Sequence, residues 1–137
     1  MLVGEIMTAK MESVNPELSL QKTACKMRDL NIGSLPVLEN GQLIGMITDR
    51  DICCRAVGDG RDTAMTKVRE IMSADVTYCY NDQEVADAAH LMEDKHVRRL
   101  AVLNRDKTMA GFLSVDDLAR YSHELACEVL VAVRPTH

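Results

Sequence analysis

The chain carries the same sequence pattern twice, and this internal repeat is the strongest constraint on its fold. Val-Gly-Glu-Ile-Met-Thr at residues 3–8 recurs as Val-Arg-Glu-Ile-Met-Ser at residues 68–73. Gly-Met-Ile-Thr-Asp-Arg-Asp at residues 45–51 recurs as Gly-Phe-Leu-Ser-Val-Asp-Asp at residues 111–117. Two homologous halves of this size commonly pack about a pseudo-twofold axis, and ligands bind in the clefts along such a seam. The pattern predicts repeats at residues 1–65 and 66–137 that together form one module.

Length, charge and hydropathy restrict the class of protein. Each half of the 137 residues is close to the lower limit for folding alone, so we expect the halves to share one core. The net charge of −5 argues against a nucleic-acid binder. No apolar run is long enough to span a membrane, and the N-terminal residues lack the features of a signal peptide. We therefore expect a cytoplasmic protein that binds neither nucleic acid nor membrane.

The cysteines and histidines give no recognisable catalytic or metal-binding pattern. The five cysteines have no disulfide-framework spacing, and we expect most of them to be buried as small hydrophobic residues. A metal site using Cys53 or Cys54 with His90 or His96 is conceivable in principle, but no tight ligand spacing is present. We predict no metal site and no enzyme, and leave open a redox role for Cys53 and Cys54.

Turn signals and apolar spacing predict the same order of elements, β-α-β-β-α, in both halves. In the first half a helix follows Ser19 and ends at Asn31, and strands at 35–38 and 43–47 flank an Asn40-Gly41 hairpin turn. A second helix runs from Thr48 to about residue 57. The predicted fold class is mixed α/β (α+β), with the helices on one face of each small sheet.

The second half repeats this order with a longer final helix. Its predicted strands lie at residues 78–80, 100–103 and 109–113, and its first helix surrounds Ala88 and Ala89. One continuous terminal helix is expected from Ser114 through Leu125 to about residue 131.

The strongest local signal is the pattern Gly-x-x-Thr/Ser-x-x-Asp. Its hydroxyl and carboxylate residues are Thr48 and Asp51 in the first copy, and Ser114 and Asp117 in the second. A hydroxyl followed three residues later by a carboxylate is a helix N-terminal capping box. The same hydroxyl and the free amides of a helix N-terminus can bind phosphate, and the carboxylate can accept ribose hydroxyls. Both roles are compatible. The glycines of the pattern, Gly45 and Gly111, are expected to leave room for a ligand against the strand.

The order of these motifs resembles the CBS domain, the module named after cystathionine β-synthase. The resemblance is carried by Ile-Met-Thr at 6–8, Ile-Gly-Ser-Leu-Pro-Val at 32–37, His-Val-Arg-Arg-Leu-Ala-Val at 96–102 and the two patterns at 45–51 and 111–117. The chain is similar to small stand-alone bacterial CBS pairs, also called Bateman modules. The resemblance covers essentially the whole chain. It implies two pseudo-twofold-related CBS repeats packed through their sheets.

The resemblance implies a regulatory, energy-sensing module that binds an adenine nucleotide in the clefts between the repeats. The expected ligand class is AMP, ADP, ATP, NAD(H) or S-adenosylmethionine, acting as a regulatory ligand, with no obligatory cofactor. The family also implies a homodimer that signals through an unknown protein partner or through a rearrangement of the dimer. The alternative is a protein-protein interaction or dimerisation module whose clefts are vestigial and unliganded.

Carried over by position, the resemblance implies these ligand-binding residues. In the first copy Thr48 binds phosphate or ribose, Asp51 binds ribose and Arg50 reaches a phosphate, while the backbone of Gly33, Ser34, Leu35 and Pro36 contacts the base. In the second copy Ser114 and Asp117 take the same roles, accompanied by Tyr80, Arg98, Arg99, Leu100, Ala101 and Asp116. Arg98 and Arg99 have no basic equivalents in the first copy, and their alternative role is a solvated surface pair. Ala101 departs from the family pattern, which has proline there.

Overall fold

The computed structural model describes residues 1–9 and 11–133, which divide into two compact units. The terminal unit consists of Met1–Met11 together with Thr77–His137, and the central unit consists of Glu12–Val76. These units are offset from the sequence repeats at 1–65 and 66–137. Residues 1–11, which begin the first repeat, belong to the terminal unit. Residues 66–76, which begin the second repeat, belong to the central unit.

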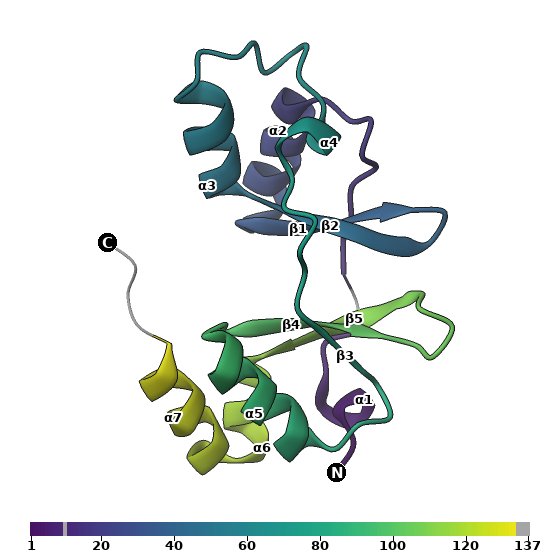
Figure 1. Ribbon diagram of the computed structural model, residues 1–137, viewed down its shortest axis with the longest axis vertical. Helices are drawn as coiled ribbons and strands as arrows, with labels where there is room; N and C mark the ends of the chain where they lie inside the picture. The colour runs from purple at the N-terminus through teal and green to yellow at the C-terminus, as the bar shows by residue number, and fades with distance from the viewer. Residues whose placement is uncertain (10, 134–137) are drawn as a thin grey trace. The chain divides into compact units, whose positions relative to one another are not determined.

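The central unit is a two-stranded antiparallel sheet with its helices on one face (Figure 1). Strands β1 and β2 pair from Ser34 opposite Thr48 to Glu39 opposite Gln42, and Val14 adds an isolated parallel bridge to Val37. The elements in chain order are α2 (Leu20–Leu30), β1 (Ser34–Glu39), β2 (Gln42–Thr48), α3 (Asp49–Asp51), η1 (Ile52–Val57) and α4 (Val68–Ile71).

The terminal unit is a three-stranded mixed sheet, and its helices also cover one face (Figure 1). Strand β3 runs parallel to β4, which runs antiparallel to β5. The elements are α1 (Val3–Ile6), β3 (Tyr78–Tyr80), α5 (Val85–Lys95), β4 (Arg99–Leu103), β5 (Met109–Ser114), α6 (Val115–Tyr121) and α7 (His123–Ala132). Across residues 1–9 and 11–133, every helix is too short or too polar to cross a bilayer.

Several local sequence signals are confirmed by the backbone. The Ser19 hydroxyl accepts a hydrogen bond from the Lys22 amide at 3.2 Å, which caps α2. Asn31 ends α2 with a left-handed φ of 55°. The hairpin between β1 and β2 turns through Asn40 and Gly41, with φ values of 55° and 79°. Such positive φ values at both central positions are the reason Asn-Gly favours this turn.

The predicted continuous terminal helix is wrong, because the chain breaks at Ser122 into α6 and α7. Ser122 has extended backbone angles, φ −153° and ψ 112°, and its hydroxyl caps α7 by accepting from the Leu125 amide at 3.3 Å. The expected helix after Thr48 is present, but only its first turn is α-helical. From Ile52 onward it is a π-helix, in which the Gly58 amide donates to the Cys53 carbonyl at 2.8 Å.

The buried apolar residues of the described chain form two clusters, one within each unit. The terminal-unit cluster is Val3, Cys79, Val85, Ala88, Ala89, Met92, Leu100, Val102, Leu113, Leu118, Ala126 and Val129. The central-unit cluster is Val14, Leu20, Met27, Leu35, Val37, Ile47, Ile52, Ala56, Val68 and Ile71. Each sheet buries one face beneath its own helices, which is the packing that amphipathic elements require.

The cysteines are more exposed than the sequence suggested, which corrects that expectation. All five are free thiols, and Cys53, Cys54 and Cys127 are exposed, whereas Cys79 is buried. Burial disfavours the charged thiolate and raises the pKa of Cys79 from 9.0 to about 11.

The Cys79 thiol should make stability depend on alkaline pH. Because its pKa is higher in the folded protein, the neutral thiol stabilises the fold fully below pH ~9, and this contribution is lost progressively toward pH ~11. We expect the free energy of unfolding of the wild type, measured by urea titration, to fall between these pH values. The fall should be about 2 kcal/mol smaller in the Cys79→Ala variant, which lacks the thiol. Identical pH profiles for both proteins would contradict the assignment.

Candidate functional site

The segments of the first copy that carry the family resemblance, residues 32–37 and 45–51, lie side by side in the central unit. Ser34 at the start of β1 pairs with Thr48 at the end of β2, and the Asp49 amide donates to the Gly33 carbonyl at 2.9 Å. This places Gly33, Ser34, Thr48 and Asp51, here called the central half-site, at one end of the sheet. Hairpin pairing therefore brings together residues that are separated in the sequence.

The second copy builds an equivalent arrangement in the terminal unit. Arg99 at the start of β4 pairs with Ser114 at the end of β5, and the Val115 amide donates to the Arg98 carbonyl at 3.0 Å. Arg98, Arg99, Ser114 and Asp117, here called the terminal half-site, therefore occupy one end of this sheet. The two adjacent arginines therefore lie near the N-terminal end of α6.

Both half-sites contain the capping box that the sequence predicted. The Thr48 hydroxyl accepts from the Asp51 amide at 3.0 Å, and the Asp51 carboxylate accepts from the Thr48 amide at 3.0 Å. In the terminal half-site the corresponding distances are 3.2 Å, from the Asp117 amide to the Ser114 hydroxyl, and 3.0 Å, from the Ser114 amide to the Asp117 carboxylate. The interpretation of these residues as helix caps is confirmed.

The carboxylates of the two half-sites differ in how many hydrogen bonds they already accept. Asp117 is buried, with a side chain 4% exposed. Besides the Ser114 amide, it accepts from the Ser114 hydroxyl at 3.1 Å, from Thr8 Oγ1 at 3.2 Å and from an Arg120 guanidinium nitrogen at 3.0 Å. A carboxylate offers about four acceptor positions, so the protein itself fills those of Asp117.

Asp51 retains accepting capacity that Asp117 lacks. Its side chain is 16% exposed, and one oxygen, Oδ2, accepts from the Thr48 amide. The other oxygen, Oδ1, lies 4.0 Å from Arg55 Nε, a distance too long for a hydrogen bond. Within the described part of the chain, Asp51 can therefore accept ligand hydroxyls at Oδ1 without displacing a protein donor.

The expectation that Gly45 and Gly111 leave room for a ligand is wrong. A Cβ on Gly111 would lie 2.4 Å from the Thr8 carbonyl oxygen, and one on Gly45 would lie 2.9 Å from the Ser73 carbonyl oxygen. Both positions face a neighbouring backbone segment, since Thr8 bridges to Phe112 and Ser73 bridges to Met46. Glycine is required here for a close approach of two protein backbones.

Several other predicted ligand-binding residues offer the ligand little besides backbone. Leu35 and Leu100 are wholly buried in the two cores. Pro36 is buried, has no amide hydrogen, and its carbonyl already accepts from the Val14 amide at 3.0 Å. Ala101, which is 2% exposed, donates its amide to the Thr77 carbonyl at 3.4 Å, a hydrogen bond that proline at this position could not make. In contrast, Arg50 and Asp116 are exposed on the first turns of α3 and α6.

Tyr80 is not brought to the terminal half-site within its unit. It pairs with Leu103, at the opposite end of β4 from Arg99, about 13 Å away along a strand. Its ring packs edge-on against Tyr78, and the Arg105 guanidinium lies 4.2 Å from the ring centroid. The hydrogen-bonded Arg105 also holds the pKa of Asp82 below its usual value.

Sequence reasoning missed three residues that contact the motif carboxylates. Arg120 and Arg55 follow Asp117 and Asp51 by three and four positions, a helical spacing that could have identified them. Thr8 is distant in sequence from Asp117, and only the tertiary structure brings its hydroxyl to the carboxylate.

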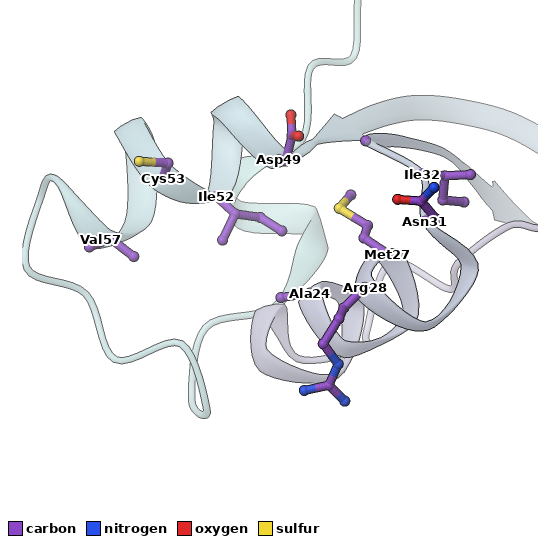
Figure 2. A pocket seen from close by; sticks show the side chains of 10 residues that line it. Ala24, Met27, Arg28, Asn31, Ile32, Asp49, Ile52, Cys53 and Val57 are labelled. Carbon is purple, nitrogen blue, oxygen red and sulfur yellow. The ribbon is translucent and has the colours of Figure 1, made fainter.

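A groove of about 520 Å³ lies on the helical side of the central unit, between α2 and the α3–η1 segment (Figure 2). Met27, Ile32, Ile52 and Val57 give it a largely apolar lining, and Gly33 connects it to the central half-site. Thr48 and Asp51 do not line it. Val57 is 61% exposed at its edge, so apolar surface is left open to solvent there.

The two half-sites repeat one local arrangement, a capped helix that follows a β-hairpin, in each unit. The family model of the CBS domain matches residues 3–57 and 68–124, so the chain belongs to the CBS-domain family. It is 35% identical over 133 residues to the CBS domain-containing protein YhcV of Bacillus subtilis, covering 96% of this chain and 94% of that protein.

Solved structures of the family share the fold. The crystal structure of hypoxic response protein I with two coordinated zinc ions has a TM-score of 0.80 and 28% identity, covering 89% of this chain and 99% of that one. A relative bearing the same name comes from Mycobacterium tuberculosis. The CBS domain pair of protein MJ0100, in complex with 5-methylthioadenosine and S-adenosyl-L-methionine, has a TM-score of 0.74 and 24% identity, covering 88% and 94%. CBSX2 in complex with AMP has a TM-score of 0.76 and 22% identity, covering 90% and 97%.

Proposed function

We propose that the protein is a regulatory sensor that binds an adenine nucleotide, with the central half-site as the principal ribose-binding position. The observation that carries this proposal is the accepting capacity of Asp51 beside Thr48. A carboxylate with a free oxygen can accept the two hydroxyls of a ribose, and hydrogen bonds to a charged group are the stronger kind. The AMP and S-adenosyl-L-methionine complexes of structurally similar CBS pairs support the ligand class.

The proposal assigns different roles to the two half-sites. Asp117 is committed to protein donors from Thr8, Ser114 and Arg120, so a ribose there would have to displace hydrogen bonds that already exist. We therefore expect one tightly bound nucleotide per chain. The nucleotide acts as a regulatory ligand and not as a cofactor for catalysis, and the output passes through a protein partner or a dimer. A cytoplasmic location without nucleic-acid or membrane binding belongs to the same proposal.

A thermal-shift panel of AMP, ADP, ATP, NAD, S-adenosylmethionine and adenosine tests the proposal. A ligand that binds only the folded state raises the melting temperature. At a concentration 100 times its Kd, it adds about 2.7 kcal/mol to the free energy of unfolding. Isothermal titration of each ligand that raises the melting temperature then gives its stoichiometry. No shift with any adenine compound, followed by no heat of binding, would leave the alternative function.

The alternative is an interaction module with unliganded half-sites, favoured by the exposed apolar groove of the central unit. Ile32 and Val57 at this groove are 38% and 61% exposed. Exposed apolar surface in a groove commonly marks a protein-protein contact. The two functions are not exclusive, since a nucleotide sensor also needs a surface through which to signal.

We expect a homodimer whose contact uses the helices that follow Thr48 and Ser114. The exposed apolar residues Val57 on η1 and Tyr121 on α6 support this surface. Sedimentation at micromolar concentration should show a dimer, and Val57→Glu should shift it toward monomer because the interface would bury a charge. Met65→Glu, at an exposed residue between η1 and α4, is the matched control. A wild-type monomer would contradict the expectation.

Arg98 and Arg99 should favour ligands that carry more phosphate charge. Both lie beside Ser114, and arginine binds phosphate through charge-assisted hydrogen bonds. Replacing both by glutamine should weaken ATP binding more than adenosine binding and flatten the salt dependence of ATP affinity. Adenosine is the control, because it senses the pocket without the phosphate. Equal losses for both ligands would mean that the arginines do not contact phosphate, and no loss for either would place them on the solvated surface.

A further inference from the structure

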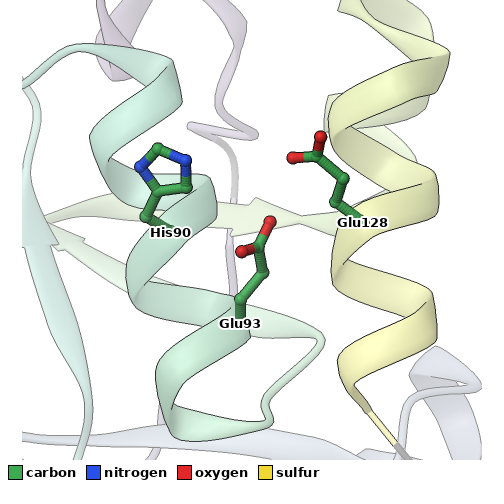
Figure 3. Close-up of side chains that lie close together, drawn as sticks. All are labelled: His90, Glu93 and Glu128. Atoms are coloured by element: carbon green, nitrogen blue, oxygen red, sulfur yellow. The ribbon is translucent and has the colours of Figure 1, made fainter.

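Three metal-ligating side chains converge between two helices of the terminal unit, away from both half-sites. Figure 3 shows His90 and Glu93 on α5 turned toward Glu128 on α7. One ligand atom from each residue lies within 4.8 Å of those of the other two. His90 and Glu93 are three positions apart on their helix, which places them on one face, while Glu128 comes from the neighbouring helix. The cluster therefore depends on tertiary packing, and sequence spacing alone did not reveal it.

The environment of Glu93 favours a positive ligand. Its Oε1 atom is buried and has no hydrogen-bond partner among the described residues. An unpartnered buried acceptor costs free energy, and the cost is larger when the group is charged. A second carboxylate, that of Glu128, lies close by, so both groups would repel one another when ionised. A cation bound between them would remove both penalties.

We propose that His90, Glu93 and Glu128 bind one divalent transition-metal ion, with Zn²⁺ as the best-fitting candidate. One imidazole nitrogen and two carboxylate oxygens form a ligand set that Zn²⁺ accepts, and a water molecule would complete four-coordination. Tetrahedral bonds of about 2.0–2.1 Å place ligand atoms roughly 3.3 Å apart. The observed separations, up to 4.8 Å, require only side-chain rotation, and His90 and Glu128 are exposed enough to rotate.

The ion would act as a clamp between α5 and the last described helix. At present α7 is held by the buried residues Ala126 and Val129 and by a contact of His96 Nδ1 with the Ala132 carbonyl at 3.0 Å. Because α5 and α7 would each contribute ligands, a bound ion would fix the distance between these two helices. Occupancy of the site would therefore stabilise the packing of α7 on α5. The three residues of the cluster lie outside both half-sites, so metal binding here does not depend on the proposed nucleotide site.

The test is isothermal titration of Zn²⁺ into the full chain after treatment with a chelator, with thiols kept reduced. We expect one saturable site per chain and a higher melting temperature in Zn²⁺. His90→Gln, Glu93→Gln and Glu128→Gln should each weaken binding by at least 10-fold and abolish the thermal shift. Circular dichroism without metal verifies that each variant is folded.

His123→Gln and Cys127→Ser are the matched controls, because both residues are exposed on α7 and outside the cluster. Both should bind Zn²⁺ as the wild type does. Loss of binding in Cys127→Ser would overturn the proposal by assigning the ion to a thiol. Absence of a saturable site would also overturn it. So would a Glu93→Gln variant that binds Zn²⁺ as tightly as the wild type does, since Glu93 would then not be a ligand.

Discussion

Replacing Asp51 with alanine is expected to weaken adenine-nucleotide binding by roughly 10- to 150-fold. The loss corresponds to about 1.5–3 kcal/mol, the range for hydrogen bonds to a charged group. The physical reason is that Oδ1 of Asp51 has no donor within hydrogen-bonding distance among residues 1–9 and 11–133, whereas Oδ2 accepts from the Thr48 amide. Isothermal titration of the wild type, Asp51→Ala and Asp51→Asn measures the effect. The asparagine variant retains part of the helix cap and separates lost binding from lost stability.

Asp117→Asn is the matched control for this prediction. Its carboxylate is 4% exposed and already accepts from Thr8, Ser114 and Arg120, so the change should cost stability, on the order of 1–3 kcal/mol, and little affinity. Equal nucleotide affinity in the wild type and both Asp51 variants would leave Asp51 with a capping role only. A larger affinity loss in Asp117→Asn than in Asp51→Ala would reverse the assignment of the half-sites.

Gly111→Ala is expected to destabilise the terminal unit by about 2–4 kcal/mol. The new Cβ would lie 2.4 Å from the Thr8 carbonyl oxygen and 3.1 Å from the Ala9 Cα, both backbone atoms that cannot rotate away. The clash should break the hydrogen bonds between Thr8 and Phe112, which are 2.8 and 2.9 Å long. Overpacking against backbone costs 1–3 kcal/mol, and losing backbone hydrogen bonds adds to it. Urea unfolding measures the loss.

Gly41→Ala separates this clash from the ordinary effect of replacing glycine. Gly41 has a φ of 79°, and no described atom beyond its chain neighbours lies within 4 Å of its added Cβ. Its replacement should cost only about 1 kcal/mol, the strain of a left-handed backbone. Hydrogen exchange should further show the Phe112 amide losing protection in Gly111→Ala alone. Equal destabilisation by the two variants would mean that the N-terminal segment is not held against β5.

The hairpins and caps could be predicted because each depends on neighbours in the chain. Asn40-Gly41 supplies the positive φ values of a tight turn, and Ser19 supplies the oxygen that caps α2. The break at Ser122 could not be predicted from apolar spacing, because Leu118 and Val129 are buried on either side of it. The same apolar pattern suits one long helix or two shorter ones, and packing against the sheet selects between them.

The sequence by itself determined the family, the internal repeat and the two hairpins, although the first strand expected in the first half is only an isolated bridge at Val14 among the described residues. Those features follow from local turn chemistry and from patterns repeated in one chain. Only the tertiary structure decided that Thr8 lies against Phe112, in the unit that contains the second copy of the motif. That contact fills the space beside Gly111 and brings the Thr8 hydroxyl to Asp117. Such contacts depend on which backbone a distant segment pairs with, and no periodicity in the sequence records that choice.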